Sequence, residues 1–277
     1  MKPLWIALLA LPLLIFPTQG EDLELFARKN LVAWCIVPFD TAKRGPEARS
    51  QMLKSLNLTQ CAYDWRAEHV PTFEEEIQQY AKHGITFFAF WGVHEDAFAL
   101  FKKYQLTPQI WQTSPSPEGK DQTSRLENAA KELAPLVTRT RELGFKLGLY
   151  NHGGWGGAPE NLVAICQHLR KTQQADHVGI VYNFHHAHEH LTQIEESLQL
   201  MKPYLHCLNL NGMNDEPNPK ILPIGQGKHD DRLLRIVASL GYDGPIGILD
   251  HRDDTDAEES LRANLDGLDK WISQQAK

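Results

Sequence analysis

The sequence predicts an α/β protein with a single (β/α)8 TIM barrel domain, and three observations support this fold class. Of its 277 residues, 42% are hydrophobic and 23% are charged, a composition typical of ordinary globular proteins. Short apolar runs alternate with segments of helical period along the chain. Eight such units in about 250 residues match a (β/α)8 barrel, whereas an open dinucleotide-binding sheet would favour a G-x-G-x-x-G turn after its first strand.

The predicted strands are short runs rich in β-branched and aromatic residues. Because each is followed by a segment of helical period, all eight are expected to run parallel and to close one barrel. In chain order they are Leu31–Val37, Gln60–Asp64, Ile85–Trp91, Thr107–Gln112, Phe145–Asn151, His177–Phe184, Tyr204–Leu210 and Pro245–Asp250.

The predicted helices lie between and after these strands. Gly84 and Gly144 each stand between a helix and a strand, where glycine supplies the positive φ that ends a helix. Thr72 with Glu75 predicts a capping box at one helix start. The helices are expected at Pro46–Ser55, Thr72–His83, Glu95–Tyr104, Ser124–Leu143, Pro159–Lys171, Ala187–Met201, Asp230–Leu240 and Asp256–Gln274.

Residues 1–20 have the pattern of a secretory signal peptide. Lys2 precedes an apolar run from Pro3 to Phe16, and Gly20 is a small residue suited to a cleavage point. The run is shorter than the roughly 20 residues that a membrane-spanning helix needs, although an uncleaved anchor is the alternative. We therefore expect an exported protein, periplasmic or extracellular, with a barrel domain over residues 21–277 and no further membrane span.

Charge and cysteine usage exclude some classes of function. The chain has 28 basic and 35 acidic residues and a net charge of −7, so a nucleic-acid partner is not expected. Cys35, Cys61, Cys166 and Cys207 lie far apart and form no C-x-x-C pair of the zinc or redox type. They are predicted to be buried free thiols, with disulfides as the alternative in an exported protein.

In a (β/α)8 barrel, ligands bind at the carboxyl ends of the strands. Most of the thirteen histidines, several amides and carboxyls, and several tryptophans fall at these ends, where tryptophan rings can stack on sugar faces. The sequence therefore predicts a carbohydrate site at this end of the barrel. The candidate residues are Asp64, Trp91, Asn151, His152, Trp155, Asn183, His186, Asn209, Asn211, Asp250 and His251.

Two local motifs add detail to this expectation. The segment Tyr150–Gly157 contains four glycines, which allow backbone to approach a ligand closely and predict an oxyanion-binding loop. No G-x-S-x-G motif accompanies it, so a lipase-like hydrolase is excluded. In the run that begins at His185, His186 and His190 have the i, i+4 spacing of metal ligands on a helix, but H-E-x-x-H is absent, and His188 and His190 are expected to be solvated.

Three segments carry a resemblance to a known family. Gly179–His186, Pro223–Gly227 and Gly241–Pro245 are similar to the G-hydrophobic-D-x-x-H strand, the P-x-G-x-G loop and the G-Y-D-G-P segment of the xylose isomerase-like TIM barrels. This family includes sugar-phosphate isomerases and epimerases. The resemblance implies the same barrel, a sugar substrate, and functional roles for His186 and for the pair Asn151-His152.

The resemblance also implies a divalent metal held by Glu, Asp, His and Glu at the ends of strands five to eight. The matching positions in this chain are Tyr150, Asn183, Asn209 and Leu249, or Asp250 in place of Leu249 if the register shifts by one. None of the first four supplies a carboxylate or imidazole, the ligand types such a metal needs. The family's metal chemistry therefore does not carry over, and no cofactor is predicted on this basis.

Three hypotheses for function follow. In the first, His152 and His186 exchange a proton next to a carbonyl of an unphosphorylated sugar or keto-sugar, with Asp250 or Asp64 orienting an imidazole and amides binding hydroxyls. In the second, the barrel is a carbohydrate-binding protein without catalysis. In the third, His152, His186 and His251 hold zinc or another transition metal in a non-standard site. The oligomeric state is left open.

Overall fold

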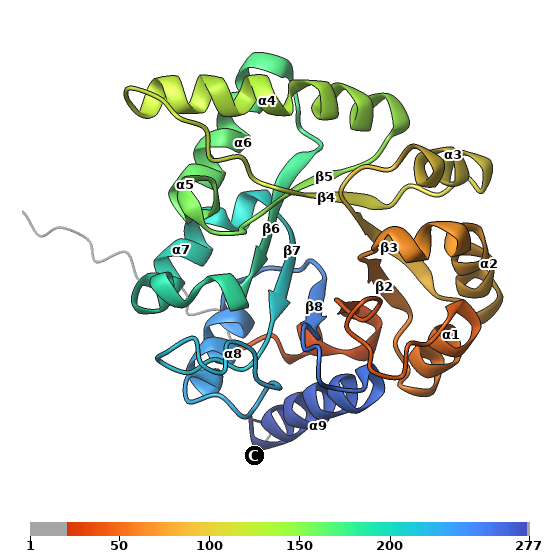
Figure 1. Cartoon of the computed structure of the whole chain (residues 1–277). Helices are drawn as coiled ribbons and strands as arrows, with labels where there is room; N and C mark the ends of the chain where they lie inside the picture. Colours follow the sequence, from red (N-terminus) through yellow and green to blue (C-terminus); the bar gives the residue numbers. More distant parts are fainter. Residues whose placement is uncertain (1–20, 276–277) are drawn as a thin grey trace, which may run out of the picture.

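The computed structural model describes residues 21–275 and shows a closed parallel barrel of eight strands, as the sequence predicts. Residues 1–20, the expected signal peptide, lie outside the described part. Figure 1 shows the strands at the centre of a ring of helices. The strands are β1 Leu31–Trp34, β2 Gln60–Tyr63, β3 Thr86–Trp91, β4 Gln109–Thr113, β5 Leu147–Tyr150, β6 Val178–Asn183, β7 Leu205–Leu210 and β8 Ile246–Leu249.

Each predicted helix is present within a few residues of its expected bounds, except that the helix after β6 begins later than predicted. A ninth, one-turn helix forms in the glycine-rich segment, which has no helical period to reveal it. The helices are α1 Pro46–Ser55, α2 Phe73–His83, α3 Glu95–Lys103, α4 Gln122–Leu143, α5 Gly154–Gly157, α6 Pro159–Gln173, α7 Ile194–Met201, α8 Asp230–Ser239 and α9 Ala257–Gln275.

The strand order places the carboxyl ends of all eight strands at one rim. Each strand pairs in parallel with its neighbours in the chain, and β1 pairs with β8 from Leu31 opposite Ile246 to Trp34 opposite Leu249, which closes the barrel. In a closed ring of eight strands, β1 lies across from β5 and β2 lies across from β6. Loops that follow those strands therefore face one another across the mouth of the barrel.

Two layers of apolar packing hold this architecture. A large outer layer packs the helices against the barrel, and a smaller inner layer fills the barrel with Val32, Trp34, Ala62, Trp111 and Val181 among others. Gly148 makes room for the inner layer, because a Cβ there would lie 2.5 Å from a Val181 methyl and 3.0 Å from the Trp111 ring. The filled interior restricts ligand access to the mouth.

The helix ends agree with the sequence at the glycines but not at the predicted capping box. Gly84 and Gly144 end their helices with φ of 69° and 72°. The capping box of Thr72 and Glu75 is wrong, because a 3-10 helix over Ala67–Thr72 leads directly into α2. Thr72 Oγ1 therefore donates to the His69 carbonyl instead of accepting from the helix start.

A buried ion pair ties α1 to α2 on the outside of the barrel. Arg49 Nη1 lies 2.5 Å from Glu76 Oε2, and the two side chains are 3% and 0% exposed. Beside them the Tyr80 hydroxyl donates to Cys61 Sγ at 3.1 Å. These four side chains, called here the ion-pair network, fix two helices against β2.

The four cysteines are all buried and free, which confirms the prediction. Within residues 21–275, no helix has the length and apolar character needed to cross a membrane.

Candidate functional site

A cavity of about 180 Å³ opens at the carboxyl end of the barrel. Its walls come from the last residues of β1, β3 and β5 and from the segments that follow β1, β2, β5, β6 and β8, which agrees with the location expected for a barrel of this type. Asp64, Trp91, His152, His186 and His251, all candidates from the sequence, line it together. The other lining residues are Trp34, Cys35, Phe39, Arg66, Tyr150 and His185.

Four imidazoles, called here the imidazole cluster, gather around this cavity. The rings of His152 and His186 are 4.5 Å apart between centroids, and those of His185 and His186 are 3.6 Å apart. The ring of His251 lies 5.4 Å from that of His185 between centroids. Ring separations of this size allow several of these side chains to contact one small ligand.

The contacts of His186 define its protonation state. Its Nδ1 lies 3.5 Å from Lys220 Nζ, and because an ammonium can only donate, Nδ1 is the acceptor and the ring proton is assigned to Nε2. Burial, followed by the charge of Lys220, lowers the pKa of His186 to about 3. Nε2 is buried and has no hydrogen-bond partner among the described residues. His186 is thus a neutral imidazole with a free N–H donor.

The local environment also favours the neutral form of His185 and His251. Burial lowers the pKa of both side chains, and the charge of Lys220 adds to the effect. At His251 the charge of Asp253 partly opposes it. The His251 ring stacks on Phe39 with 4.0 Å between centroids. Its Nδ1 lies 3.6 Å from Cys35 Sγ, so the thiol and the imidazole contact each other at the cavity wall.

Asp64 and Asp250 are buried carboxyl groups next to the cavity. Burial raises the pKa of Asp64 to about 7 and that of Asp250 to about 8. Asp64 Oδ1 accepts from the Val37 backbone N–H at 3.4 Å, while Asp64 Oδ2 and both Asp250 oxygens lack partners among residues 21–275. The nearest cation to Asp250 is Arg252, with Nε 3.9 Å from Oδ1. Neither carboxyl group hydrogen-bonds to an imidazole, so neither orients a histidine ring as the sequence led us to expect.

The floor of the cavity is aromatic. Trp34 packs edge-on against Trp111 with 4.8 Å between centroids, and Trp91 packs edge-on against Tyr150 at 4.9 Å. The Tyr150 hydroxyl accepts from Trp34 Nε1 at 3.3 Å and also contacts the Asn183 amide nitrogen. Aromatic surface of this kind is well suited to the apolar face of a sugar ring.

The four asparagines that were expected to bind hydroxyls are buried and contact other parts of the protein instead. Asn151 Nδ2 donates to the Asn183 carbonyl at 3.0 Å, and the Asn183 N–H donates to Asn151 Oδ1 at 2.7 Å. Asn211 Nδ2 donates to the Gly212 carbonyl at 2.8 Å. Asn209 is fully buried. Its Oδ1 packs against Gly247 so closely that a Cβ atom added to Gly247 would lie 1.7 Å from it. None of the four lines the central cavity.

The glycine-rich segment lies beside the cavity rather than inside it. Gly153, Gly154 and Gly157 line a neighbouring space of about 370 Å³ that shares His152, His185 and His186 with the central cavity. Trp155 lines neither the central cavity nor this neighbouring space. Its Nε1 donates to Gln122 Oε1 at 3.0 Å, and the Arg125 guanidinium lies over its ring, 4.8 Å from the centroid. Trp155 therefore packs the rim.

The run after β6 differs from its predicted helix. Two 3-10 helices, Phe184–His186 and His188–Gln193, replace its first turns, and α7 begins only at Ile194. The Asn183 side chain accepts from the His185 N–H at 3.3 Å and turns the chain there. His186 and His190 are consequently not i, i+4 neighbours on one helix, and His188 and His190 are half-buried rather than solvated.

The positions that match the family's metal ligands do not fit a divalent cation. Burial raises the pKa of the Tyr150 phenol well above its ordinary value, and Asn183, Asn209 and Leu249 offer no charge. Asp250, the alternative in a shifted register, is the raised-pKa carboxyl described above. Within residues 21–275, no three His, Cys, Asp or Glu side chains are placed to hold a metal ion, so the expected site of His152, His186 and His251 is not assembled.

Some site residues were not predicted from the sequence. Cys35 was assigned to the core of its strand, but it follows β1 with φ of 61° and lines the cavity. His185 enters the imidazole cluster because the chain turns at Asn183. Lys220 reaches His186 from the long segment between β7 and α8, where no periodic pattern marks it.

Comparison with known proteins extends these observations. The sequence profile of the family described as "Xylose isomerase-like TIM barrel" matches residues 39–271. Among curated proteins, no significant sequence match is found.

Several solved structures share the fold. A D-tagatose 3-epimerase-like protein is 15% identical with a TM-score of 0.66, covering 90% of this chain and 100% of that chain. The IolI protein, solved with a bound zinc atom, is 14% identical with a TM-score of 0.66, covering 88% and 98%. The 3-keto-D-glucoside 4-epimerase from E. coli is 13% identical with a TM-score of 0.63, covering 89% and 99%.

Proposed function

Because this chain belongs to the xylose isomerase-like TIM barrel family, we propose that it is a sugar isomerase or epimerase that moves a proton next to a carbonyl. The observation that carries this proposal is the imidazole cluster around one cavity at the carboxyl end of the barrel. Proton transfer at such a carbon needs a base and a hydrogen-bond donor to the carbonyl oxygen, both of which imidazoles can supply.

The contacts of the cluster favour different roles for two histidines. His186 is neutral and has a free Nε2–H, so we assign it the hydrogen bond to the carbonyl oxygen, where a neutral imidazole stabilises developing negative charge. Its lowered pKa makes it a poor proton acceptor. His152 is exposed and lies 4.5 Å from His186 between ring centroids, so we assign it the role of base.

A second proton-transfer group lies on the opposite wall. Asp64 follows β2, across the barrel from β6, and lines the same cavity. Because burial raises the pKa of Asp64 to about 7, a substantial fraction of it is protonated near neutral pH. We propose that it returns the proton to the sugar from the face opposite His152, which is the geometry that an epimerase needs.

The proposal includes export and an unphosphorylated substrate. The basis is the pattern of residues 1–20, because phosphorylated sugars are cytoplasmic intermediates. Cell fractionation followed by N-terminal sequencing of the native protein tests this part. A mature chain that begins at Glu21 is expected, and a cytoplasmic protein that retains Met1 or Lys2 would overturn it.

A second function, carbohydrate binding without catalysis, is favoured by one observation. The aromatic floor made by Trp34, Trp91 and Tyr150 can bind a sugar whether or not any proton moves. The buried amides at the family's ligand positions are also compatible with a barrel that has lost its chemistry.

Solvent isotope exchange separates the two functions. The protein is incubated in D2O with D-tagatose, D-psicose and a 3-keto-glucoside, and NMR follows deuterium entering the carbon next to the carbonyl. We expect exchange by the wild type and a loss of about 100-fold or more in His152→Asn, a typical contribution of a general base. His168→Asn, on the outer helix α6, is the matched control.

The outcomes are distinct. Exchange that His152→Asn abolishes and His168→Asn preserves supports the isomerase. Sugar binding by calorimetry without any exchange supports the carbohydrate-binding protein. Exchange that survives in His152→Asn would overturn the assignment of the base.

A further inference from the structure

Lys220 brings an unpaired positive charge to the mouth of the barrel. Its Nζ lies 3.5 Å from His186 Nδ1, and the residue lines both spaces that adjoin the central cavity, of about 370 and 320 Å³. Within the described residues no carboxylate oxygen lies within 4.0 Å of this ammonium. Among residues 21–275, the one side chain that Lys220 Nζ contacts through a hydrogen bond is His186, an imidazole that stays neutral.

Arg66 brings a second positive charge. It follows β2 and lines the central cavity, where its guanidinium lies 5.4 Å from the centroid of the Phe39 ring and Nη1 donates to the Trp65 carbonyl at 2.8 Å. In the part of the chain that the structure describes, Arg66 too has no carboxylate within 4.0 Å. By contrast, Arg44 and Arg49, behind the neighbouring loops, are each paired with acids.

Lys220 and Arg66 line neighbouring spaces at the mouth of the barrel. Arg66 lines the central cavity together with His251, and Lys220 lines one of the adjoining spaces together with the same ring. His185 lines the central cavity and both adjoining spaces. His186 also lines the central cavity and the 370 Å³ space, His251 also lines the central cavity and the 320 Å³ space, and Lys220 lines both adjoining spaces. The mouth is therefore one continuous site with a lysine and an arginine on it.

The acidic side chains at the mouth are not paired with either cation, although the exposed Asp253 partly offsets the effect of Lys220 and Arg66 on the pKa of His251. Asp64, which lines the cavity, and Asp250 beside it have raised pKa values because they are buried. Glu189 and Asp254 line only the outer spaces, are exposed, and lie beyond 4.0 Å from either cation. The whole chain has a net charge of −7, so a positive mouth is not a consequence of composition.

We propose that the substrate is a sugar acid, whose carboxylate binds in the part of the mouth that Lys220 and Arg66 line while its carbonyl carbon faces the imidazole cluster. This inference rests on the proposed function and names the substrate class for the same site. Carboxylates form charge-assisted hydrogen bonds with lysine and arginine that are roughly twice as strong as neutral ones. The neutral histidines add N–H donors without adding charge, which suits a singly charged carboxylate better than a phosphate dianion.

Matched pairs of ligands test this inference. Binding of D-glucuronate is compared with that of D-glucose, and D-galacturonate with D-galactose, by calorimetry at low salt, with D-glucose 6-phosphate as a third arm. We expect each acid to bind at least about tenfold more tightly than its neutral partner, with the advantage falling as salt rises. Phosphate binding more tightly than both acids would overturn the choice of carboxylate.

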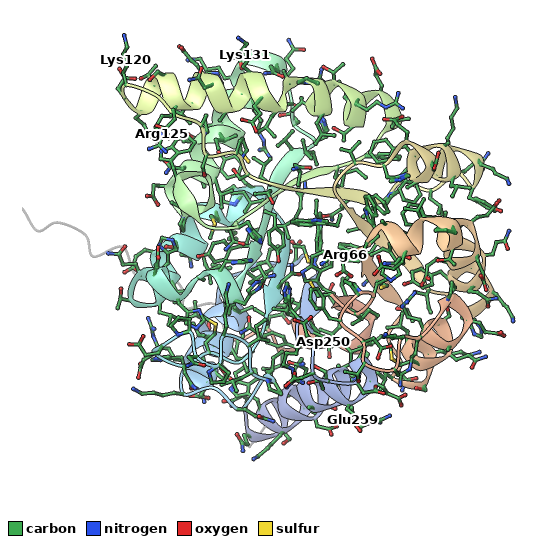
Figure 2. The ribbon with its side chains drawn as sticks, in the orientation of Figure 1. Arg66, Lys120, Arg125, Lys131, Asp250 and Glu259 are labelled. Atoms are coloured by element: carbon green, nitrogen blue, oxygen red, sulfur yellow. The ribbon has the colours of Figure 1, made fainter. Side chains whose placement is uncertain are left out.

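Variants identify the groups responsible. Lys220→Gln and Arg66→Gln are each expected to weaken binding of the acids about tenfold more than they weaken binding of the neutral sugars. Lys120→Gln and Lys131→Gln are the controls, because Figure 2 places both lysines at the outer edge of the molecule near α4, whereas Arg66 lies inside the ring of helices. All four substitutions remove one positive charge, so only position differs.

Each result decides the inference. Neutral sugars that bind as well as the acids would overturn it while leaving the proposed function intact. If neither acids nor neutral sugars bind, the proposed function fails together with it. Equal loss of acid binding in Lys220→Gln and Lys131→Gln would show a general charge effect rather than a site.

Discussion

Two sets of buried ionisable groups, one packed outside the barrel against β2 and one at the mouth after β2 and β8, differ in how they are partnered. In the ion-pair network, Arg49 contacts Glu76 and Tyr80 contacts Cys61. At the mouth, three carboxyl oxygens of Asp64 and Asp250 have no partner among residues 21–275. Arg49 Nε and Glu76 Oε1 also lack hydrogen-bond partners of their own within this range, but each of these side chains contacts an opposite charge. Among the described residues, the carboxyl groups at the mouth have no opposite charge closer than 3.9 Å, which indicates a place where a ligand can complete the structure.

The comparison shows why burial alone does not identify a functional site. Glu76 is as buried as Asp250, with both 0% exposed. What separates them is the neighbour: an arginine at 2.5 Å holds Glu76, whereas the nearest cation to Asp250 is 3.9 Å away. Glu76 belongs to a structural tie between two helices, whereas Asp250 directly precedes His251, which lines the cavity where substrate is proposed to bind.

Breaking the ion-pair network is expected to have the largest effect on stability. Arg49→Met leaves the Glu76 carboxylate buried without a partner, which costs about 3–5 kcal/mol of unfolding free energy. Urea denaturation measures it. Arg49→Met combined with Glu76→Leu is expected to recover much of the loss, because the double variant leaves no unpaired charge. If Arg49→Met is as stable as wild type, the ion pair does not stabilise the fold, and the proposed difference between the paired and unpaired buried groups is wrong.

The carboxyl groups at the mouth are expected to make stability depend on pH. Their folded-state pKa values, about 7 and about 8, lie above the ordinary value of 3.8, so the folded protein binds these protons more tightly than the unfolded chain. Stability is therefore highest below pH 4 as far as these groups are concerned, and is lost as pH rises toward 7 and 8. The slope is up to roughly 1.4 kcal/mol per pH unit for each group.

Asp64→Asn and Asp250→Asn each remove part of that slope. Thermal or urea denaturation between pH 5 and 9 is expected to show a flatter profile for both variants and higher stability than wild type above pH 8. Asp243→Asn, at an exposed position, is the control and is expected to keep the wild-type slope. A wild-type profile that is flat over this range contradicts the protonated state proposed for Asp64.

Thiol labelling is expected to show the smallest difference between the two regions. Cys35 is 4% exposed at the cavity wall, whereas Cys61, Cys166 and Cys207 are fully buried. A small reagent such as methyl methanethiosulfonate is expected to modify Cys35 first, although slowly, because burial raises the pKa of its thiol. Peptide mass mapping gives the order of modification. Earlier labelling of Cys61 would indicate that the ion-pair network opens before the mouth.

Much of the fold could be predicted because its signal is periodic. Runs such as Leu205–Leu210 and glycines such as Gly84 follow directly from strand and helix chemistry. The glycine-rich turn of α5 and the 3-10 helices near His186 could not be predicted in the same way. The turn of α5 depends on a tertiary hydrogen bond from the Gly156 N–H to Ser116 Oγ, between residues far apart in the sequence. The 3-10 helix at Phe184–His186 depends on the local bond between the His185 N–H and the Asn183 side chain, which replaces the expected helical turn.

The site was predicted in its location more than in its composition. His152, His186, His251, Asp64 and Trp91 were expected at the mouth and all line the cavity. The asparagines at the same strand ends point into the interior, because a strand end has two faces and the sequence does not say which one a single residue takes. The contribution of Lys220 depends on the path of an irregular segment, which has no sequence pattern.

Gly247 and Asn209 also bear on how this family can diversify. A Cβ at residue 247 would come within 1.7 Å of Asn209 Oδ1, so a side chain can appear there only if position 209 shrinks or turns. The two sites are thus predicted to covary among homologues, with larger residues on β8 accompanied by smaller ones on β7. An ancestor with a bulkier residue at 247 would have had a different occupant at 209, and reverting only one of the two would be disfavoured.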